Sequence, residues 1–242
     1  MAFKQKISGD CPSLPPGLSF TVRFSTRRRT LALAVTLTGE VVVHAPAGTP
    51  EAAIRQALAR HRDWLARTTA ERRRALAALQ PGCAYYLGQP LAVEVTSGAS
   101  RGVARRGESL IVCQPSPEPD PWPLLVAWYR REAAAELASR IRHYAPRLGV
   151  RVAGMELRDW KRRWGECRPA EGLVRLHWRL ILLPLELVDY VVVHELAHLE
   201  VPGHPPRFWA RVTDILPDWP MRRRRLNGEW APFLGWRWHP KG

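Results

Sequence analysis

The sequence has few acidic residues and few cysteines. Its 242 residues include 22 Asp and Glu against 37 Lys and Arg, which gives a formal net charge of +15. The four cysteines form no C-x-x-C pair. This pattern argues against a disulfide framework or a zinc ribbon and is typical of proteins from a reducing compartment.

Long apolar runs are also missing. The most apolar region, residues 180–193, is interrupted by Pro184, Glu186 and Asp189, so the sequence predicts no membrane span. The N-terminal residues lack the apolar segment of a secretory signal. We therefore expect a cytoplasmic protein whose residues 1–17 form a flexible N-terminus.

Basic residues, nearly all of them arginines, gather in four clusters at residues 27–29, 72–74, 161–163 and 222–225. Such clusters predict attraction to phosphate backbones that weakens as salt is added. They also fit solvent-exposed faces of a protein from a GC-rich genome, which favours arginine codons. Nucleic acid is therefore a candidate partner on charge alone.

Alternating apolar residues over 18–24, 31–37 and 41–43 predict strands of a small antiparallel sheet. Thr49 as N-cap and Pro50 at the first helical position predict a helix that runs to about Leu79. Residues 84–113 have the pattern of further short strands, so we expect a β-rich region with one long helix over 18–114.

The proline-rich stretch 114–123 cannot form regular structure and predicts a boundary. A long helix is expected from about 122 to 144, then strands near 154–160 and 173–180, and then a helix that contains "VVVHELAHLE". The predicted fold class is α+β. The second predicted region covers residues 122–242.

The last predicted helix carries two histidines four residues apart, His194 and His198. On a helix these side chains share one face and can reach one ion, while Glu195 stands beside them without ligating it. In an H-E-x-x-H motif zinc activates a water molecule and the glutamate accepts its proton. The apolar residues around the motif strengthen this interpretation, because unpaired ionisable groups would be unfavourable there.

His204 is the preferred third ligand. Pro202 and Gly203 end the helix, and a glycine turn can bring the chain back toward the metal. Glu200 lies about 200° round the helix from His198 and must face away. Three protein ligands leave one open position, as catalytic zinc requires. The alternatives are that His194 and His198 are core histidines and that His204 caps the next helix.

Three stretches of the chain resemble the YgjP-like metallopeptidase family, which is related to the SprT-like zinc proteases. They are "RRRTLALAV" with "APAGTPEAAI", then "RRWGECRPAEGLVRLHWRLILLPLELVDYVVVHELAHL", and finally "GHPPRFWARVTDILPDW". The resemblance implies a zincin-like fold in the catalytic region 122–242. It also implies one zinc ion on His194, His198 and His204, and Glu195 as general base.

The histidine spacing also matches metzincins, but Val201 stands where they have glycine and no Met-turn is evident. Glu166 departs from the family's usual serine and would alter substrate preference if it lined the cleft. Cys167 matches the family's cysteine. We expect it to pack beneath the helix with Trp164, because a fourth protein ligand would close the site.

The stretch "GLVRLHWRLIL", residues 172–182, precedes the motif helix, and we expect it to be a substrate-facing edge strand. His177 on this strand is expected to face outward or to be a packing residue, rather than to bind the metal. Tyr190, one turn before His194, is expected to lie on the ligand face.

These observations together predict a zinc-dependent peptidase that acts on peptides or proteins. Two alternatives stay open. The basic surface could direct the protease to DNA-bound substrates, or the zinc could only brace an interaction module.

Overall fold

The computed structural model describes residues 19–115 and 120–239, and these divide into two compact units, Met1–Ala78 and Leu79–Gly242. The expected flexible segment 1–17 lies outside the described residues, as do residues 116–119 of the predicted boundary. The observed division falls at Ala78, so the strands between residues 83 and 114 belong to the same unit as the motif helix. Each unit has its own hydrophobic core.

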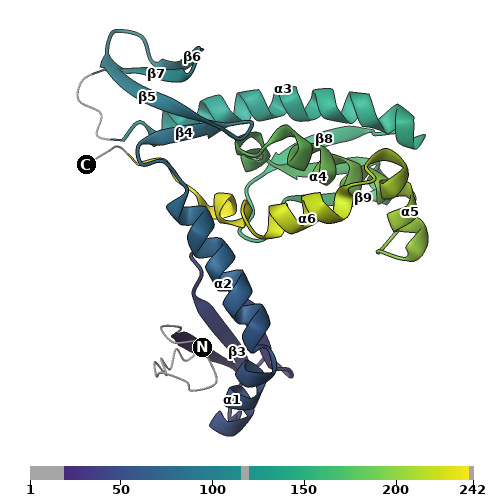
Figure 1. The fold of residues 1–242 in the computed structure, drawn as a ribbon. Coiled ribbons are helices and arrows are strands. Elements are labelled where there is room, and N and C mark those ends of the chain that lie inside the picture. The colour runs from purple at the N-terminus through teal and green to yellow at the C-terminus, as the bar shows by residue number, and fades with distance from the viewer. Residues whose placement is uncertain (1–18, 116–119, 240–242) are drawn as a thin grey trace. The chain divides into compact units, whose positions relative to one another are not determined.

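The first unit contains a three-stranded sheet and two helices (Figure 1). Its strands are β1 (Phe20–Ser25), β2 (Ala32–Val35) and β3 (Val41–Pro46), in the order β1-β3-β2. β2 pairs antiparallel with β3, but β1 runs parallel to β3. The predicted antiparallel sheet is therefore mixed. Apolar alternation identifies strands but does not determine which strand lies between the others.

The long helix predicted in this unit is two helices, α1 (Glu51–Arg60) and α2 (Arg62–Ala77). His61 interrupts them with φ −109° and ψ 16°. The buried positions Ile54, Leu58 and Leu65 continue through this break at helical spacing, which is why the sequence predicted one helix. The N-cap is Pro50 rather than Thr49, whose hydroxyl donates instead to the Pro46 carbonyl at 2.8 Å.

The second unit begins with a four-stranded sheet of order β4-β5-β7-β6. Its strands are β4 (Cys83–Tyr86), β5 (Gln89–Ser97), β6 (Gly102–Arg106) and β7 (Ser109–Gln114). β6 pairs antiparallel with β7, although its glycine and arginines give it no apolar alternation. The turn between β4 and β5 donates backbone hydrogen bonds from Leu87 and Gly88 to Ile181 and Leu182, directly before the motif helix.

The second sheet of this unit consists of β8 (Gly154–Arg158), β9 (Gly165–Arg168) and β10 (Leu173–His177). Its order is β8-β10-β9, with β10 parallel to β8 and antiparallel to β9. The prediction that residues 172–182 form an edge strand is wrong. β10 is central, because β9, a strand that the sequence pattern did not reveal, occupies the edge next to the motif helix.

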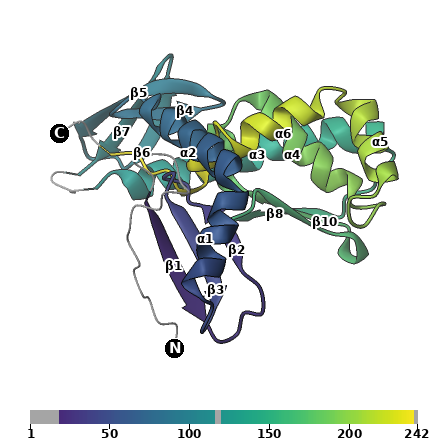
Figure 2. The same cartoon turned by 60° about the horizontal axis from the view of Figure 1, so that its bottom comes forward.

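Helices fill the rest of the second unit (Figures 1 and 2). α3 (Trp122–Leu148) is longer than predicted, since Pro146 fits in its last turn and Gly149, with φ 69°, ends it. The motif helix α4 (Leu185–Ala197) packs against α3, α5 (Pro206–Ile215) and α6 (Trp219–Asn227). Short 3-10 turns precede α4 at Trp178–Leu182 and follow α6 at Ala231–Gly235.

α4 is buried along nearly its whole length. Its hydrophobic residues join one core that extends from β4 to Trp238. Among the described residues no helix is long and apolar enough to cross a membrane. The motif is held in the interior of the second unit, with its C-terminal end at a pocket.

Candidate metal centre

Three histidines converge at the C-terminal end of α4. The Nε2 atom of His194 lies 3.3 Å from Nε2 of His198 and 3.1 Å from Nε2 of His204. The potential ligand atoms of all three lie within 4.8 Å of one another. Two nitrogens bound to one tetrahedral zinc at ~2.0–2.1 Å are about 3.3 Å apart, so the observed separations fit such an ion.

The helix supplies two of these side chains and the turn after it supplies the third. His198 is the C-cap of α4, one helical turn after His194. Gly203 has φ 69°, a conformation that glycine adopts without strain, and it reverses the chain before His204. Pro205 and Pro206 then begin α5. The structure thus brings together the three residues that the sequence singled out.

Burial favours the neutral form of His194 and His198, which is the form that binds a metal. Burial lowers the pKa of His194 to about 3, and its neighbours His198, His204 and Arg223 lower it further. The pKa of His198 is also lowered, mainly by burial. Nδ1 of His198 lies 3.1 Å from the Val201 carbonyl, a contact that orients its Nε2 toward the other histidines.

The ring of His194 is held differently. Its Nδ1 is buried and has no hydrogen-bond partner in the part of the chain that the structure describes. Packing fixes the ring instead, with Phe208 and Trp209 at centroid distances of 4.9 and 5.9 Å. α5 therefore supports the site through its aromatic residues.

Glu195 is the acidic group of the site and is only 7% exposed. Burial raises its pKa to about 8, the negative charge of Glu166 adds to the rise, and Arg163 opposes it. A bound dication would favour the carboxylate form. The side chain packs against Gly165 of β9, where an added Cβ would lie 2.5 Å from Oε1 of Glu195.

The other candidate ligands lie outside the histidine group. Glu200 pairs with Arg211 at 2.6 Å. Burial, together with the charge of Glu195, raises the pKa of Cys167 to about 12, so this thiol stays protonated. His177 is fully buried on β10, where its Nδ1 accepts a hydrogen bond from the Arg179 backbone N–H. The three observations agree with the roles expected from the sequence.

Glu166 is held by basic neighbours. Its carboxylate lies 2.8 Å from the Arg163 guanidinium and 3.4 Å from that of Arg175. It is not among the residues that line the pocket at the histidines. Its charge thus affects the pKa of Glu195 without facing the cavity.

That pocket has a volume of about 550 Å³. Its lining comes from β9 and the residue before it, from α4 and the turn that carries His204, and from α5 and α6. The lining residues are Trp164, Gly165, Tyr190, Val191, His194, Glu195, His204, Trp209, Arg223, Leu226 and Asn227.

Tyr190 therefore lies on the ligand side of α4, as expected. Burial raises its pKa to about 12, while the Arg223 charge opposes the rise. The sequence did not single out Gly165, Trp209, Arg223 or Asn227. Gly165 lies inside the second of the three stretches that resemble the family, whereas the approach of α6 to α4 leaves no local signal in the sequence.

Three convergent histidines and a buried glutamate around an open pocket define a hydrolytic metal centre as a class. The model of the family described as YgjP-like, metallopeptidase domain, matches residues 29–229. The chain belongs to this family and is a metallopeptidase. The assignment confirms the predicted α+β class with a zincin-like domain.

Among solved structures, the chain matches the metallopeptidase zymogen abylysin of Pyrococcus abyssi at 24% identity. The match covers 37% of this chain and 90% of the other, with a TM-score of 0.35. No curated protein matches the chain.

Proposed function

We propose that the protein is a zinc-dependent peptidase in which His194, His198 and His204 hold one zinc ion and Glu195 is the general base. The observation that carries this proposal is the convergence of three histidines. Nε2 of His194 lies 3.3 Å from Nε2 of His198 and 3.1 Å from Nε2 of His204, and the ligand atoms of all three lie within 4.8 Å of one another. The donor set fits zinc, since three imidazoles with an open fourth position are typical of catalytic zinc sites.

Zinc in this position would supply the Lewis acidity that polarises a peptide carbonyl and activates a water molecule. Glu195 then performs the proton transfers. Its carboxylate accepts the proton of the attacking water and afterwards gives it to the nitrogen of the leaving amine. Gly165 holds this side chain against β9, and the buried position restricts other orientations.

Substitution of the general base tests the mechanism. Glu195→Gln keeps the side-chain volume but cannot accept the proton, so we expect peptide hydrolysis to fall by about 100-fold or more. Zinc content, measured by elemental analysis, should remain that of the wild type. The matched control is Glu200→Gln, a neighbouring carboxylate outside the pocket, which should retain activity. Wild-type activity in Glu195→Gln would overturn the role.

Loss of a ligand tests the metal site. His204→Ala should lower the zinc content, because only two imidazoles would remain. His143→Ala replaces an exposed histidine on α3 and should leave the zinc content unchanged. Full zinc occupancy in His204→Ala would remove this residue from the ligand set.

A further inference from the structure

We propose that Arg223 is an anion-binding residue of the pocket that recognises a carboxylate of the peptide substrate. The inference rests on the peptidase function proposed above and adds a substrate preference to it. The carboxylate can come from an acidic side chain or from the C-terminus of a peptide, and the experiment below distinguishes these sources.

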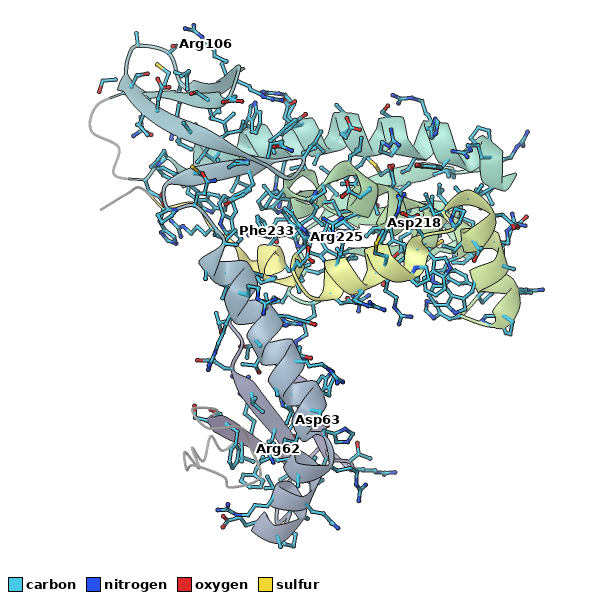
Figure 3. The ribbon with its side chains drawn as sticks, in the orientation of Figure 1. Arg62, Asp63, Arg106, Asp218, Arg225 and Phe233 are labelled. Carbon is cyan, nitrogen blue, oxygen red and sulfur yellow. The ribbon has the colours of Figure 1, made fainter. Side chains whose placement is uncertain are left out.

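Arg223 faces the pocket from one side of α6. The lining residues Arg223, Leu226 and Asn227 are three and four positions apart, which places them on the same face of the helix. His194 and Glu195 line the same pocket from α4. Asp218 and Arg225, labelled in Figure 3, mark the course of α6 along this region.

Among the described residues, the Arg223 guanidinium packs on an aromatic ring but has no carboxylate partner. It lies over the Trp209 ring at 5.3 Å, and Trp209 stacks on Trp219 with centroids 4.0 Å apart. Throughout residues 19–115 and 120–239, no carboxylate forms an ion pair with it. By contrast, Arg222 pairs with Asp218, and Arg225 pairs with Glu186 and Glu229.

An arginine that already packs on an aromatic ring loses less side-chain conformational entropy when it binds a ligand than an arginine without such a contact. Its planar fork matches a carboxylate, with which it can form two parallel hydrogen bonds. Glu195 is the one acidic lining residue among those described, and a metal ion on the neighbouring histidines would compensate its charge. The pocket therefore favours a negatively charged group beside the reacting carbonyl.

The test is a positional peptide library in which each site carries Glu, Gln or Lys, with a free or an amidated C-terminus. We expect wild-type hydrolysis to favour Glu over Gln at one site, or the free over the amidated C-terminus, by about five- to tenfold. Arg223→Gln should lose this preference, and Arg223→Glu should favour Lys instead. Arg224→Gln, an exposed neighbour outside the pocket lining, should behave as the wild type.

A binding measurement keeps the inference separate from the peptidase proposal. Labelled Glu and Gln peptides are titrated against Glu195→Gln, and against Glu195→Gln with Arg223→Gln, by fluorescence anisotropy. The Glu and free-carboxyl peptides should bind about five- to tenfold more weakly to the double variant, at equal zinc content and melting temperature. Equal affinities would overturn the inference even if hydrolysis is observed. Absence of all hydrolysis in the wild type would instead overturn the proposed function.

Discussion

Gly165 determines where the Glu195 carboxylate can lie. Any side chain at this position would meet the Oε1, Cγ and Cδ atoms of Glu195 at 2.5 to 2.7 Å. An added methyl group would displace the glutamate, and its position for proton transfer would be lost. Close approach of backbone to a functional group is a typical reason for glycine.

We therefore expect Gly165→Ala to fold and bind zinc but to hydrolyse peptides at least about 100-fold more slowly, since misplaced catalytic groups lose about this much. Steady-state kinetics with elemental analysis checks this. Gly102→Ala is the matched control, because an added Cβ at Gly102 would meet no atom within 4 Å. Gly107 also has open space, but its φ of +57° would strain an alanine. Unchanged kinetics in Gly165→Ala would contradict this role.

His177 is a second residue whose environment has a measurable consequence. Because Nδ1 accepts from Arg179, Nε2 carries the proton and donates to the Trp160 carbonyl at 2.9 Å. Burial lowers the pKa of His177 to about 4 from 6.5. Arg179 and Arg130 lower it further, while the Trp160 hydrogen bond and Asp159 oppose the change.

Between pH 6.5 and 4 the unfolded chain therefore binds more protons at this residue than the folded protein does. The free energy of unfolding should decrease as the pH falls through this window, by up to about 3 kcal/mol from His177 alone. Urea unfolding of His177→Asn and of the control His143→Asn checks it. The first variant should show a weaker pH dependence; equal slopes would disprove the assignment.

At the scale of elements, an ion pair anchors α4 to α3. Asp189 accepts hydrogen bonds from Arg140 at 2.6 and 2.9 Å and from the Tyr144 hydroxyl at 2.9 Å. Asp189 and Arg140 are both largely buried, with 10% and 20% of their side chains exposed. His194 follows Asp189 by five residues on the same helix, so this contact fixes the helix that carries the ligands.

Asp189→Ala leaves the Arg140 charge without its partner. We expect the free energy of unfolding to fall by about 3 kcal/mol, the size typical for breaking a buried pair. Thermal or urea unfolding measures this, with Asp214→Ala, an exposed acid on α5, as the control. A change within about 0.5 kcal/mol would show that the pair contributes little.

The sequence predicted the elements that have strong local signals. α4 could be predicted because its apolar run and the H-E-x-x-H spacing agree, and the glycine turn indicated His204. β9 could not, because four residues with glycine and charge lack a β pattern. The order β8-β10-β9 and the position of Arg223 depend on contacts between distant segments, which local periodicity does not encode.

At the scale of the whole molecule, the chain carries a formal net charge of +15, and the proposed peptidase mechanism does not use this charge. Nucleic-acid contact stays a prediction from this charge. If basic clusters bind phosphates, affinity for a DNA duplex should fall steeply as salt rises from 50 to 200 mM, by about 10³-fold or more for six contacts. A gel shift across this series measures it. No binding at low salt would end this alternative.

The most direct test of the metallopeptidase account is a zinc titration of chelator-treated protein in which bound zinc and peptide hydrolysis are measured on the same samples. Both should rise together and saturate at one zinc per chain, and His204→Ala should show neither rise. Hydrolysis at full rate without metal would contradict the account. So would one bound zinc without hydrolysis of any peptide, the result expected if the ion only braced the fold.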